Sequence, residues 1–166
     1  MRTVNFNGEQ MILLGTEINV GDKAPSCSVL TTALEKTSIE ELEGKVKLVS
    51  VVPSIDTGVC STQTNTFNKE VAALDHVQAV TISMDLPFAQ ERWQEENNAN
   101  DVIMLSDHVH ADFGMKYGVL IQKLRLLTRA VFIIDSSGVI VYEEIVEEVT
   151  DSVNYEAALE ALKSAK

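Results

Sequence analysis

The sequence predicts an α/β protein in which helices flank both faces of a central mixed β-sheet, with an N-terminal β-hairpin. Strand-like and helix-like stretches alternate along the middle of the chain, which is typical of parallel strands joined by helices. Two late strand-like stretches are separated only by a short turn, which predicts an antiparallel pair. A length of 166 residues fits one domain spanning 1–166.

The first predicted elements are a hairpin and a short strand. Asn7-Gly8 lies between two strand-like runs within residues 3–14, and this dipeptide is the strongest short signal for a hairpin turn. Residues 21–25 suit a turn, because they begin with glycine and end with proline. Residues 27–30 are then predicted to form a strand.

A short helix and a buried strand follow. Ser38 and Glu41 have the spacing of a helix capping box, and Gly44 suits the end of that helix. Residues 45–52 are rich in β-branched side chains, which is typical of a strand buried on both faces. Pro53 ends this strand because proline has no N–H to donate to a central ladder.

The next helix opens at about Cys60. Phe67, Val71 and Leu74 stand at i, i+4 and i+7, which gives this helix one apolar face. Cys60 is therefore expected in, or just before, the first helical turn.

The remaining elements continue the alternation. Strands are predicted at 77–83, 102–105, 129–135 and 139–145, and helices from residue 85, at 111–117 and at the C-terminal end. Pro87 favours a helix start, and the turn at 136–138 joins the last two strands. The C-terminal helix is predicted from apolar residues with helical spacing: Tyr155, Ala158, Leu159 and Leu162.

The composition excludes several partners and sites. A formal net charge of −12 repels polyanions, so neither nucleic acid nor an anionic membrane is an expected partner. We expect a cytoplasmic protein, because the chain shows no secretory signal and no apolar run of about 18 residues. Two cysteines form neither a disulfide framework nor a metal-finger spacing. We predict no metal or cofactor, and interpret His108 and His110 as surface residues.

The position of Cys60 predicts thiolate chemistry. The unpaired amide groups and the positive dipole end of a helix start favour a thiolate over a thiol. The thiolate is the nucleophilic form of cysteine. An inert buried cysteine is the alternative.

Several segments resemble the peroxiredoxins, and in particular their bacterial thiol peroxidase subfamily. Pro53, Thr57 and Cys60 match the Pro-x-x-x-Thr-x-x-Cys signature of that family. The resemblance extends over essentially the whole chain, through residues 21–25, 53–60, 83–93 and 127–135.

The resemblance implies a thioredoxin-like fold and a thiol-dependent peroxidase for hydrogen peroxide and alkyl hydroperoxides. It implies that Cys60 attacks the peroxide and becomes a sulfenic acid. The Thr57 hydroxyl would hydrogen-bond the sulfur and the peroxide, and Pro53 would roof the pocket. Arg129 matches a strand-borne arginine that stabilises the thiolate, the alternative being a half-buried structural arginine.

The resemblance also implies partners and a pocket. The expected partners are a hydroperoxide, thioredoxin or another thiol reductant, and a second copy of the chain in a homodimer. Phe88, Arg92 and Trp93 are candidates for the substrate pocket; packing and solvation are the alternative for Arg92 and Trp93.

The sequence departs from this subfamily where its members usually carry a second, resolving cysteine. That position is Gln94. Three routes stay open: an external thiol reduces the Cys60 sulfenic acid, two subunits join through Cys60, or Cys27 resolves it. We favour the external thiol, because Cys27 lies in a strand-like stretch and is better interpreted as a buried small hydrophobic residue.

Two other functions compete with the peroxidase. A dithiol oxidoreductase needs Cys-x-x-Cys, whereas Gln63 stands three residues after Cys60. A redox sensor or adaptor, which would relay Cys60 oxidation to a partner protein without efficient turnover, stays open because the resolving cysteine is missing.

Overall fold

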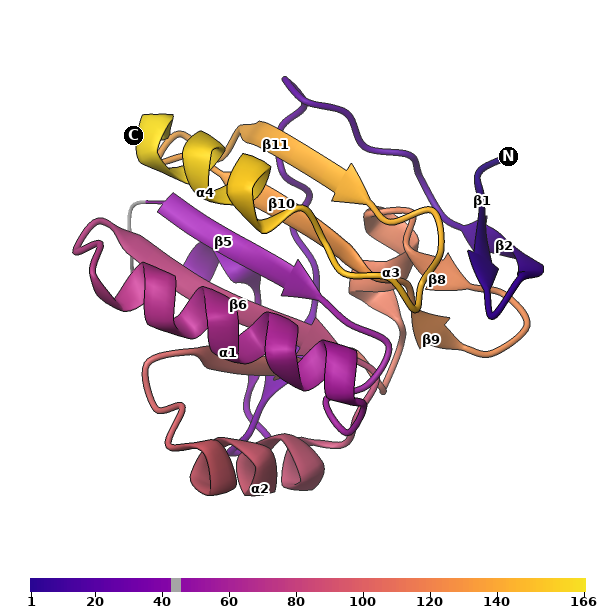
Figure 1. Cartoon of the computed structure of the whole chain (residues 1–166), viewed down its shortest axis with the longest axis horizontal. Coiled ribbons are helices and arrows are strands. Elements are labelled where there is room, and N and C mark those ends of the chain that lie inside the picture. The colour runs from indigo at the N-terminus through magenta and orange to yellow at the C-terminus, as the bar shows by residue number, and fades with distance from the viewer. Residues whose placement is uncertain (43–45) are drawn as a thin grey trace.

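A seven-stranded mixed sheet forms the centre of the computed structural model, which describes residues 1–42 and 46–166 (Figure 1). The strand order is β11-β10-β5-β6-β7-β3-β4. β5, β6 and β7 pair in parallel, and the other neighbours are antiparallel. The bounds are β3 Val29–Thr31, β4 Lys36–Thr37, β5 Val46–Val51, β6 Val77–Ser83, β7 Ile103–Ser106, β10 Ala130–Ile134 and β11 Ile140–Ile145. The predicted mixed sheet is confirmed.

A second, four-stranded sheet contains the predicted hairpin. Its order is β1-β2-β8-β9, with β1 Thr3–Phe6, β2 Glu9–Leu14, β8 Leu120–Ile121 and β9 Leu126–Leu127. Asn7 and Gly8 form the turn with φ of 52° and 80°, a left-handed conformation that these residue types tolerate well. The sequence did not predict β4, β8 or β9, because two residues are too few to show an alternating pattern.

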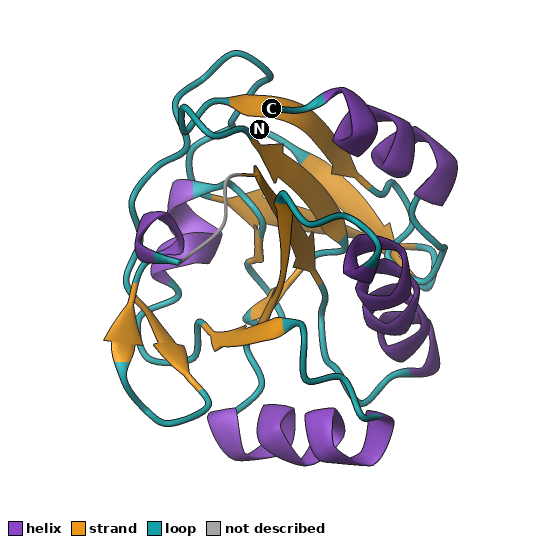
Figure 2. Cartoon of the chain, turned by 90° about the vertical axis from the view of Figure 1, so that its left-hand side faces the viewer, coloured by secondary structure: helices purple, strands orange, loops and turns teal. Residues whose placement is uncertain are grey.

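Helices cover both faces of the central sheet (Figure 2). Their bounds are α1 Gly58–Ala72, α2 Pro87–Asn97, α3 Asp112–Lys116 and α4 Tyr155–Ser164. Phe67 of α1 and Leu162 of α4 pack with Leu48 of β5 in one hydrophobic cluster. Phe113 of α3 packs with Val49 of β5 in the other. Since successive strand side chains point to opposite faces, β5 contributes to both clusters, as a strand buried on both sides must.

The predicted capping box is wrong. Ser38 precedes only a 3-10 turn, Ile39–Glu41, and its side chain makes no capping hydrogen bond. The Glu41 carboxylate instead accepts a hydrogen bond from the Thr37 hydroxyl. The expected stop at Gly44 lies outside the described residues.

The pairing of β5 with β10 has two ends, at opposite edges of the sheet. Ala130 pairs with Val51 at one end, and Ile134 pairs with Lys47 at the other. Every residue of both strands is buried. Within the described part of the chain, no helix is long and apolar enough to cross a membrane.

Candidate active site

Cys60 lies in the first turn of α1, as the sequence predicts. The helix begins at Gly58, and Thr57 is its N-cap residue. The Thr57 hydroxyl accepts a hydrogen bond from the Cys60 amide at 3.2 Å, which satisfies one of the free amides at the helix start. Thr57 is exposed, whereas Cys60 is fully buried directly behind it.

Arg129 places its guanidinium against the Cys60 sulfur. Its Nη2 donates to Cys60 Sγ at 3.1 Å, and its side chain is buried. Its Nη1 donates to Gln63 Oε1 at 2.9 Å, and its Nε donates to the Val149 carbonyl at 2.7 Å. The planar guanidinium is therefore fixed in one orientation. A buried cation that donates to the sulfur favours the thiolate.

The strand pairing explains why Arg129 reaches Cys60. Arg129 directly precedes β10, and Ala130 pairs with Val51, the last residue of β5. The chain leaves β5 at Val51 and enters α1 a few residues later, so both side chains lie at the same end of the sheet. The isolated guanidinium that the sequence shows beside an apolar strand thus has one hydrogen-bond partner for each of its three nitrogens.

Gln63 is a site residue that the sequence analysis missed. Its Oε1 accepts from Arg129, and its Nε2 donates to the Ser50 hydroxyl at 2.6 Å. Gln63 is fully buried. It therefore connects the guanidinium to β5. A signal was available: Gln63 lies three residues after Cys60, on the buried face of α1 that also carries Phe67.

The segment that carries Pro53 is held by Asp85, which the sequence analysis also missed as a site residue. The Asp85 carboxylate accepts from the Ser54 hydroxyl at 2.8 Å and from the Ile55 amide at 2.7 Å. Asp85 follows β6, the parallel neighbour of β5, so the two chain segments leave the sheet at the same edge. Pro53 itself is buried at this edge.

The three candidate pocket residues lie in different environments. Phe88 is 65% exposed, and Trp93 is packed in the hydrophobic cluster of α1 and α4, where its indole donates to the Ser61 hydroxyl at 3.0 Å. Arg92 is exposed and pairs with Asp56 at 2.5 Å. Phe88 and Arg92 stand four residues apart on α2, and Arg92 forms its ion pair with the segment between Pro53 and Cys60.

Cys27 lies away from the Cys60 cluster. It is buried in the hydrophobic cluster on the α3 face of the sheet, and both cysteines are free thiols. Burial, with the carboxylates of Asp107 and Asp112, raises the pKa of Cys27 to about 12. These surroundings keep the Cys27 thiol protonated.

Gln94 takes part in local hydrogen bonding on α2. Its Nε2 donates to the Ala99 carbonyl at 3.1 Å and to the Val102 carbonyl at 2.8 Å. These bonds connect the end of α2 to the segment that leads into β7. Among the described residues, no group of three or more His, Cys, Asp or Glu side chains is arranged to hold a metal ion.

Comparisons with known structures identify the fold. A peroxiredoxin-like protein from Aquifex aeolicus superposes with a TM-score of 0.92 at 40% identity, covering 99% of this chain and 97% of that one. A thiol peroxidase from Chromobacterium violaceum superposes with a TM-score of 0.89 at 21% identity, covering 98% and 95%. The expected thioredoxin-like fold is confirmed.

Comparisons with known sequences identify the family. A model of the family described as Redoxin matches residues 19–159. A thiol peroxidase of Oceanobacillus iheyensis is 53% identical over 162 residues, covering 98% of this chain and 99% of that protein. The thiol peroxidase of Bacillus subtilis is 49% identical over 164 residues, covering 99% and 98%. The chain therefore belongs to the redoxin family and, within it, to the peroxiredoxin-type thiol peroxidases of bacteria.

Proposed function

We propose that the chain reduces hydrogen peroxide and alkyl hydroperoxides through a sulfenic acid on Cys60, and that an external thiol resolves this intermediate. The hydrogen bond from Arg129 Nη2 to Cys60 Sγ is the observation that carries the proposal. It joins a buried cation to a sulfur that already lies at the positive end of α1. Arg92 and Phe88 stay proposals for the rim of the pocket.

The first step is a substitution at oxygen. The Cys60 thiolate attacks one peroxide oxygen, an S–O bond forms and the O–O bond breaks. The second oxygen leaves as hydroxide or alkoxide and takes a proton, giving water or an alcohol. Arg129 has donors on the edge of the guanidinium that faces the sulfur, where this charge develops. Thr57, exposed beside the buried sulfur, marks the side from which a peroxide would arrive.

The second step needs two equivalents of thiol. One thiol attacks the sulfenic acid, releasing water and leaving a mixed disulfide on Cys60; a second thiolate then releases the reductant disulfide and regenerates Cys60. Gln94 offers no sulfur, and Cys27 is protonated in a separate cluster. Thioredoxin or a small thiol is therefore the proposed reductant, and a reducing cytoplasm is the proposed location.

Trapping the oxidised cysteine tests the proposal. One equivalent of peroxide is added to the reduced protein, a sulfenic-acid reagent follows, and the intact mass is measured. We expect one adduct on Cys60 and none in Cys60→Ser. A loss of two hydrogens without adduct would mean an intramolecular disulfide and would contradict the external-thiol route.

Steady-state turnover separates the peroxidase from the redox sensor. With thioredoxin and its reductase, or with a small thiol, we expect continuous peroxide consumption. One turnover followed by no further consumption with every thiol would favour the sensor.

Introducing a cysteine at position 94 tests whether the missing sulfur there is what prevents an intramolecular disulfide. Gln94→Cys restores a sulfur at the position that resolving cysteines occupy in the resembling family. We expect the variant to form an intramolecular disulfide after peroxide treatment, while the unchanged chain gives only the adduct. An adduct alone in both proteins would show that α2 does not open enough for the bond.

A homodimer is also part of the proposal. Leu86 and Phe88 are 52% and 65% exposed at the start of α2, close in sequence to the Asp85 that holds the Pro53 segment. Exposed apolar side chains of this size favour a protein contact. Sedimentation of the unchanged chain and of Phe88→Asp would show whether two copies associate there.

A further inference from the structure

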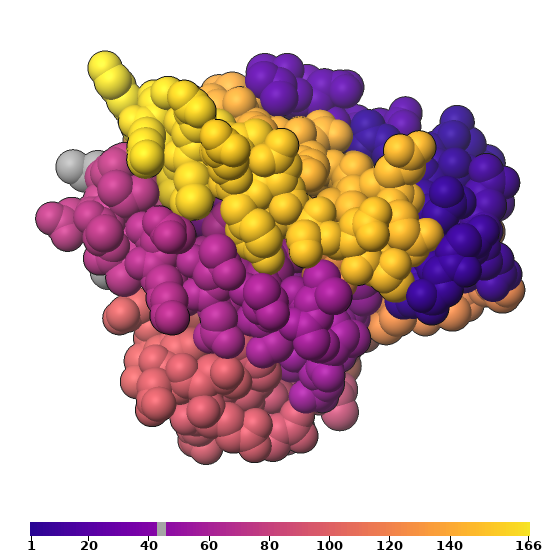
Figure 3. Space-filling model, in the orientation of Figure 1, coloured from indigo at the N-terminus to yellow at the C-terminus, as the bar shows by residue number. Residues whose placement is uncertain are grey.

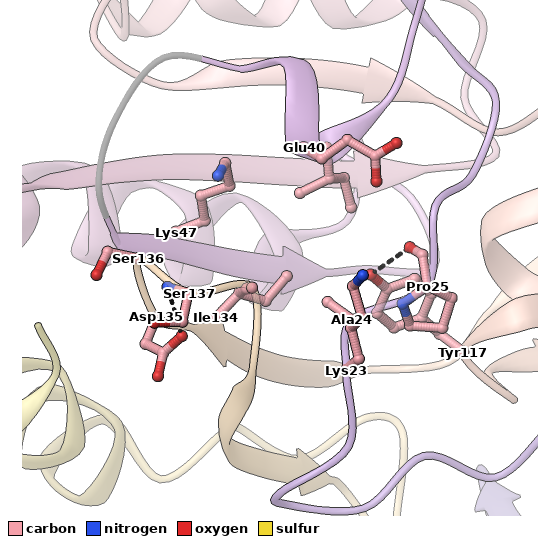
Figure 4. Close-up of a pocket in the computed structure, with 12 residues that line it drawn as sticks. Lys23, Ala24, Pro25, Glu40, Lys47, Tyr117, Ile134, Asp135, Ser136 and Ser137 are labelled. Atoms are coloured by element: carbon pink, nitrogen blue, oxygen red, sulfur yellow. Dashed lines mark hydrogen bonds between the residues drawn. The ribbon is translucent and has the colours of Figure 1, made fainter.

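A cavity of about 420 Å³ opens at the other end of the β5–β10 pair from Cys60 (Figure 4). Lys47 of β5 lines it from one strand and Ile134 of β10 from the other, and these two residues pair in the sheet. The turn after β10 closes one side of the cavity. Its volume lies within the range of small-molecule sites in proteins. The Cys60 cluster uses none of these residues.

Lys47 is the unusual group in this cavity. Its side chain is nine-tenths buried, yet it forms no ion pair or hydrogen bond with any residue in the described ranges. Figure 4 shows it extending from β5 with the turn at Ser136 on one side and Glu40 on the other. The ammonium is not among the fully buried atoms that lack a partner, so it reaches the open space of the cavity while its aliphatic stem is covered. No acceptor of the described residues bonds this ammonium, and an anion in the cavity would pair with it.

The two carboxylates in the cavity already have partners. Asp135 Oδ1 accepts from the Ser137 amide at 2.9 Å and from the Val139 amide at 3.0 Å. Glu40 Oε1 accepts from the Ser26 hydroxyl at 2.6 Å. Neither carboxylate accepts a hydrogen bond from Lys47.

The charge and the walls limit the ligand. Lys23 and Lys47 balance Glu40 and Asp135, so a monoanion leaves less net charge in the cavity than a dianion would. The remaining wall is largely apolar and includes Ile39 and Ile134. We propose that this cavity binds a small organic monocarboxylate, with its carboxylate on Lys47 and its apolar part against these isoleucines.

Calorimetric titration of the full chain tests the proposal, with sodium benzoate as the probe. We expect benzoate to bind one to one, benzyl alcohol at least about tenfold more weakly, and inorganic phosphate more weakly than benzoate. Lys47→Met should weaken benzoate binding by about tenfold or more, whereas Lys47→Arg should keep it. Lys163→Met, which removes an exposed lysine of α4, is the matched control and should change nothing.

Two further measurements keep the result interpretable. Circular dichroism must show Lys47→Met folded, and its peroxide consumption should equal that of the unchanged chain, because Lys47 lies outside the Cys60 cluster. Absence of benzoate binding, equal affinity in Lys47→Met, or tighter binding of phosphate or benzyl alcohol would each overturn the proposal.

Discussion

The two cysteines of this chain are both buried, and their surroundings are opposite. Cys60 is 0% exposed and Cys27 is 2% exposed, so accessibility does not distinguish them. Arg129 donates a hydrogen bond to the Cys60 sulfur, whereas burial and two carboxylates raise the pKa of Cys27 to about 12. The sign of the neighbouring charge, more than the depth of burial, decides which sulfur is poised as a nucleophile.

The largest expected effect comes from exchanging each sulfur for oxygen. Cys60→Ser should lower peroxide consumption by about 10³-fold or more, because the nucleophile is removed. Cys27→Ser should stay within about twofold of the unchanged chain, provided it remains folded. Steady-state rates with equal thiol concentrations measure both. Equal losses in the two variants would show that the comparison is wrong and that Cys27 takes part in turnover.

Removing the Arg129 cation should make Cys60 less reactive toward peroxide and therefore more like Cys27. Arg129→Met should lower the second-order rate constant with peroxide by about 10- to 100-fold, the range expected for losing a charged hydrogen bond. Arg129→Lys should recover only part of this, since an ammonium does not reproduce the fixed fork of donors. Stopped-flow mixing gives the rate, and a thermal unfolding midpoint separates it from loss of folding. An unchanged rate in Arg129→Met would remove the basis of the proposed mechanism.

Removing a residue that fixes the Arg129 guanidinium should also slow the reaction with peroxide, but by less than removing Arg129 itself. Gln63→Leu removes the acceptor for Arg129 Nη1 and the connection to Ser50, and we expect about a tenfold slower reaction with peroxide. Gln94→Leu is the matched control, because it also removes side-chain hydrogen bonds of a helix glutamine but none that involves Cys60 or Arg129. Equal slowing in both variants would indicate general destabilisation instead of positioning.

The smallest expected effect is a pH dependence that belongs to Cys27. The folded chain raises the pKa of Cys27 from 9.0 to about 12, so the folded state holds its proton where the unfolded state loses it. The resulting stabilisation is present below pH 9 and is lost as the pH rises toward 12. In the Cys60→Ser background, the free energy of unfolding should fall by about 1 kcal/mol between pH 8 and pH 10 relative to a variant that also carries Cys27→Ala. Chemical denaturation at the two pH values measures this, and a parallel response of the two proteins would contradict it.

The sequence predicted the site to different extents in its different parts. The helix start at about Cys60 was predicted from local rules, because Pro53 ends a strand and Phe67, Val71 and Leu74 give the following stretch a helical apolar face. Arg129 was placed only through resemblance to a family, since local patterns do not say where a residue 69 positions later will lie. Gln63 and Asp85 were missed because their roles depend on partners across the sheet.

In the fold, too, features set by local sequence were predicted and features set by distant partners were not. The Asn7-Gly8 hairpin was predicted because its turn is local, and the β5–α1–β6 alternation because each element carries its own apolar period. The capping box at Ser38 failed although its spacing was right, since the Glu41 carboxylate bonds to Thr37 instead of returning to the cap. Short strands such as β8 form because a neighbouring strand supplies their hydrogen bonds. The local sequence does not predict which distant strand that neighbour will be.

The Val149 carbonyl that accepts from Arg129 is itself held by the other end of the chain. The Val149 amide donates to the Asn5 carbonyl, and the Asn5 amide donates to the Glu147 carbonyl, each at 2.8 Å. Figure 3 shows this late segment lying against the N-terminal hairpin. During synthesis on the ribosome, Cys60 consequently emerges long before its cation is in place. The Cys60 thiol lacks the hydrogen bond from Arg129 until the segment at Val149 has packed against the segment at Asn5. Cys60 therefore becomes reactive only after these distant segments have folded together.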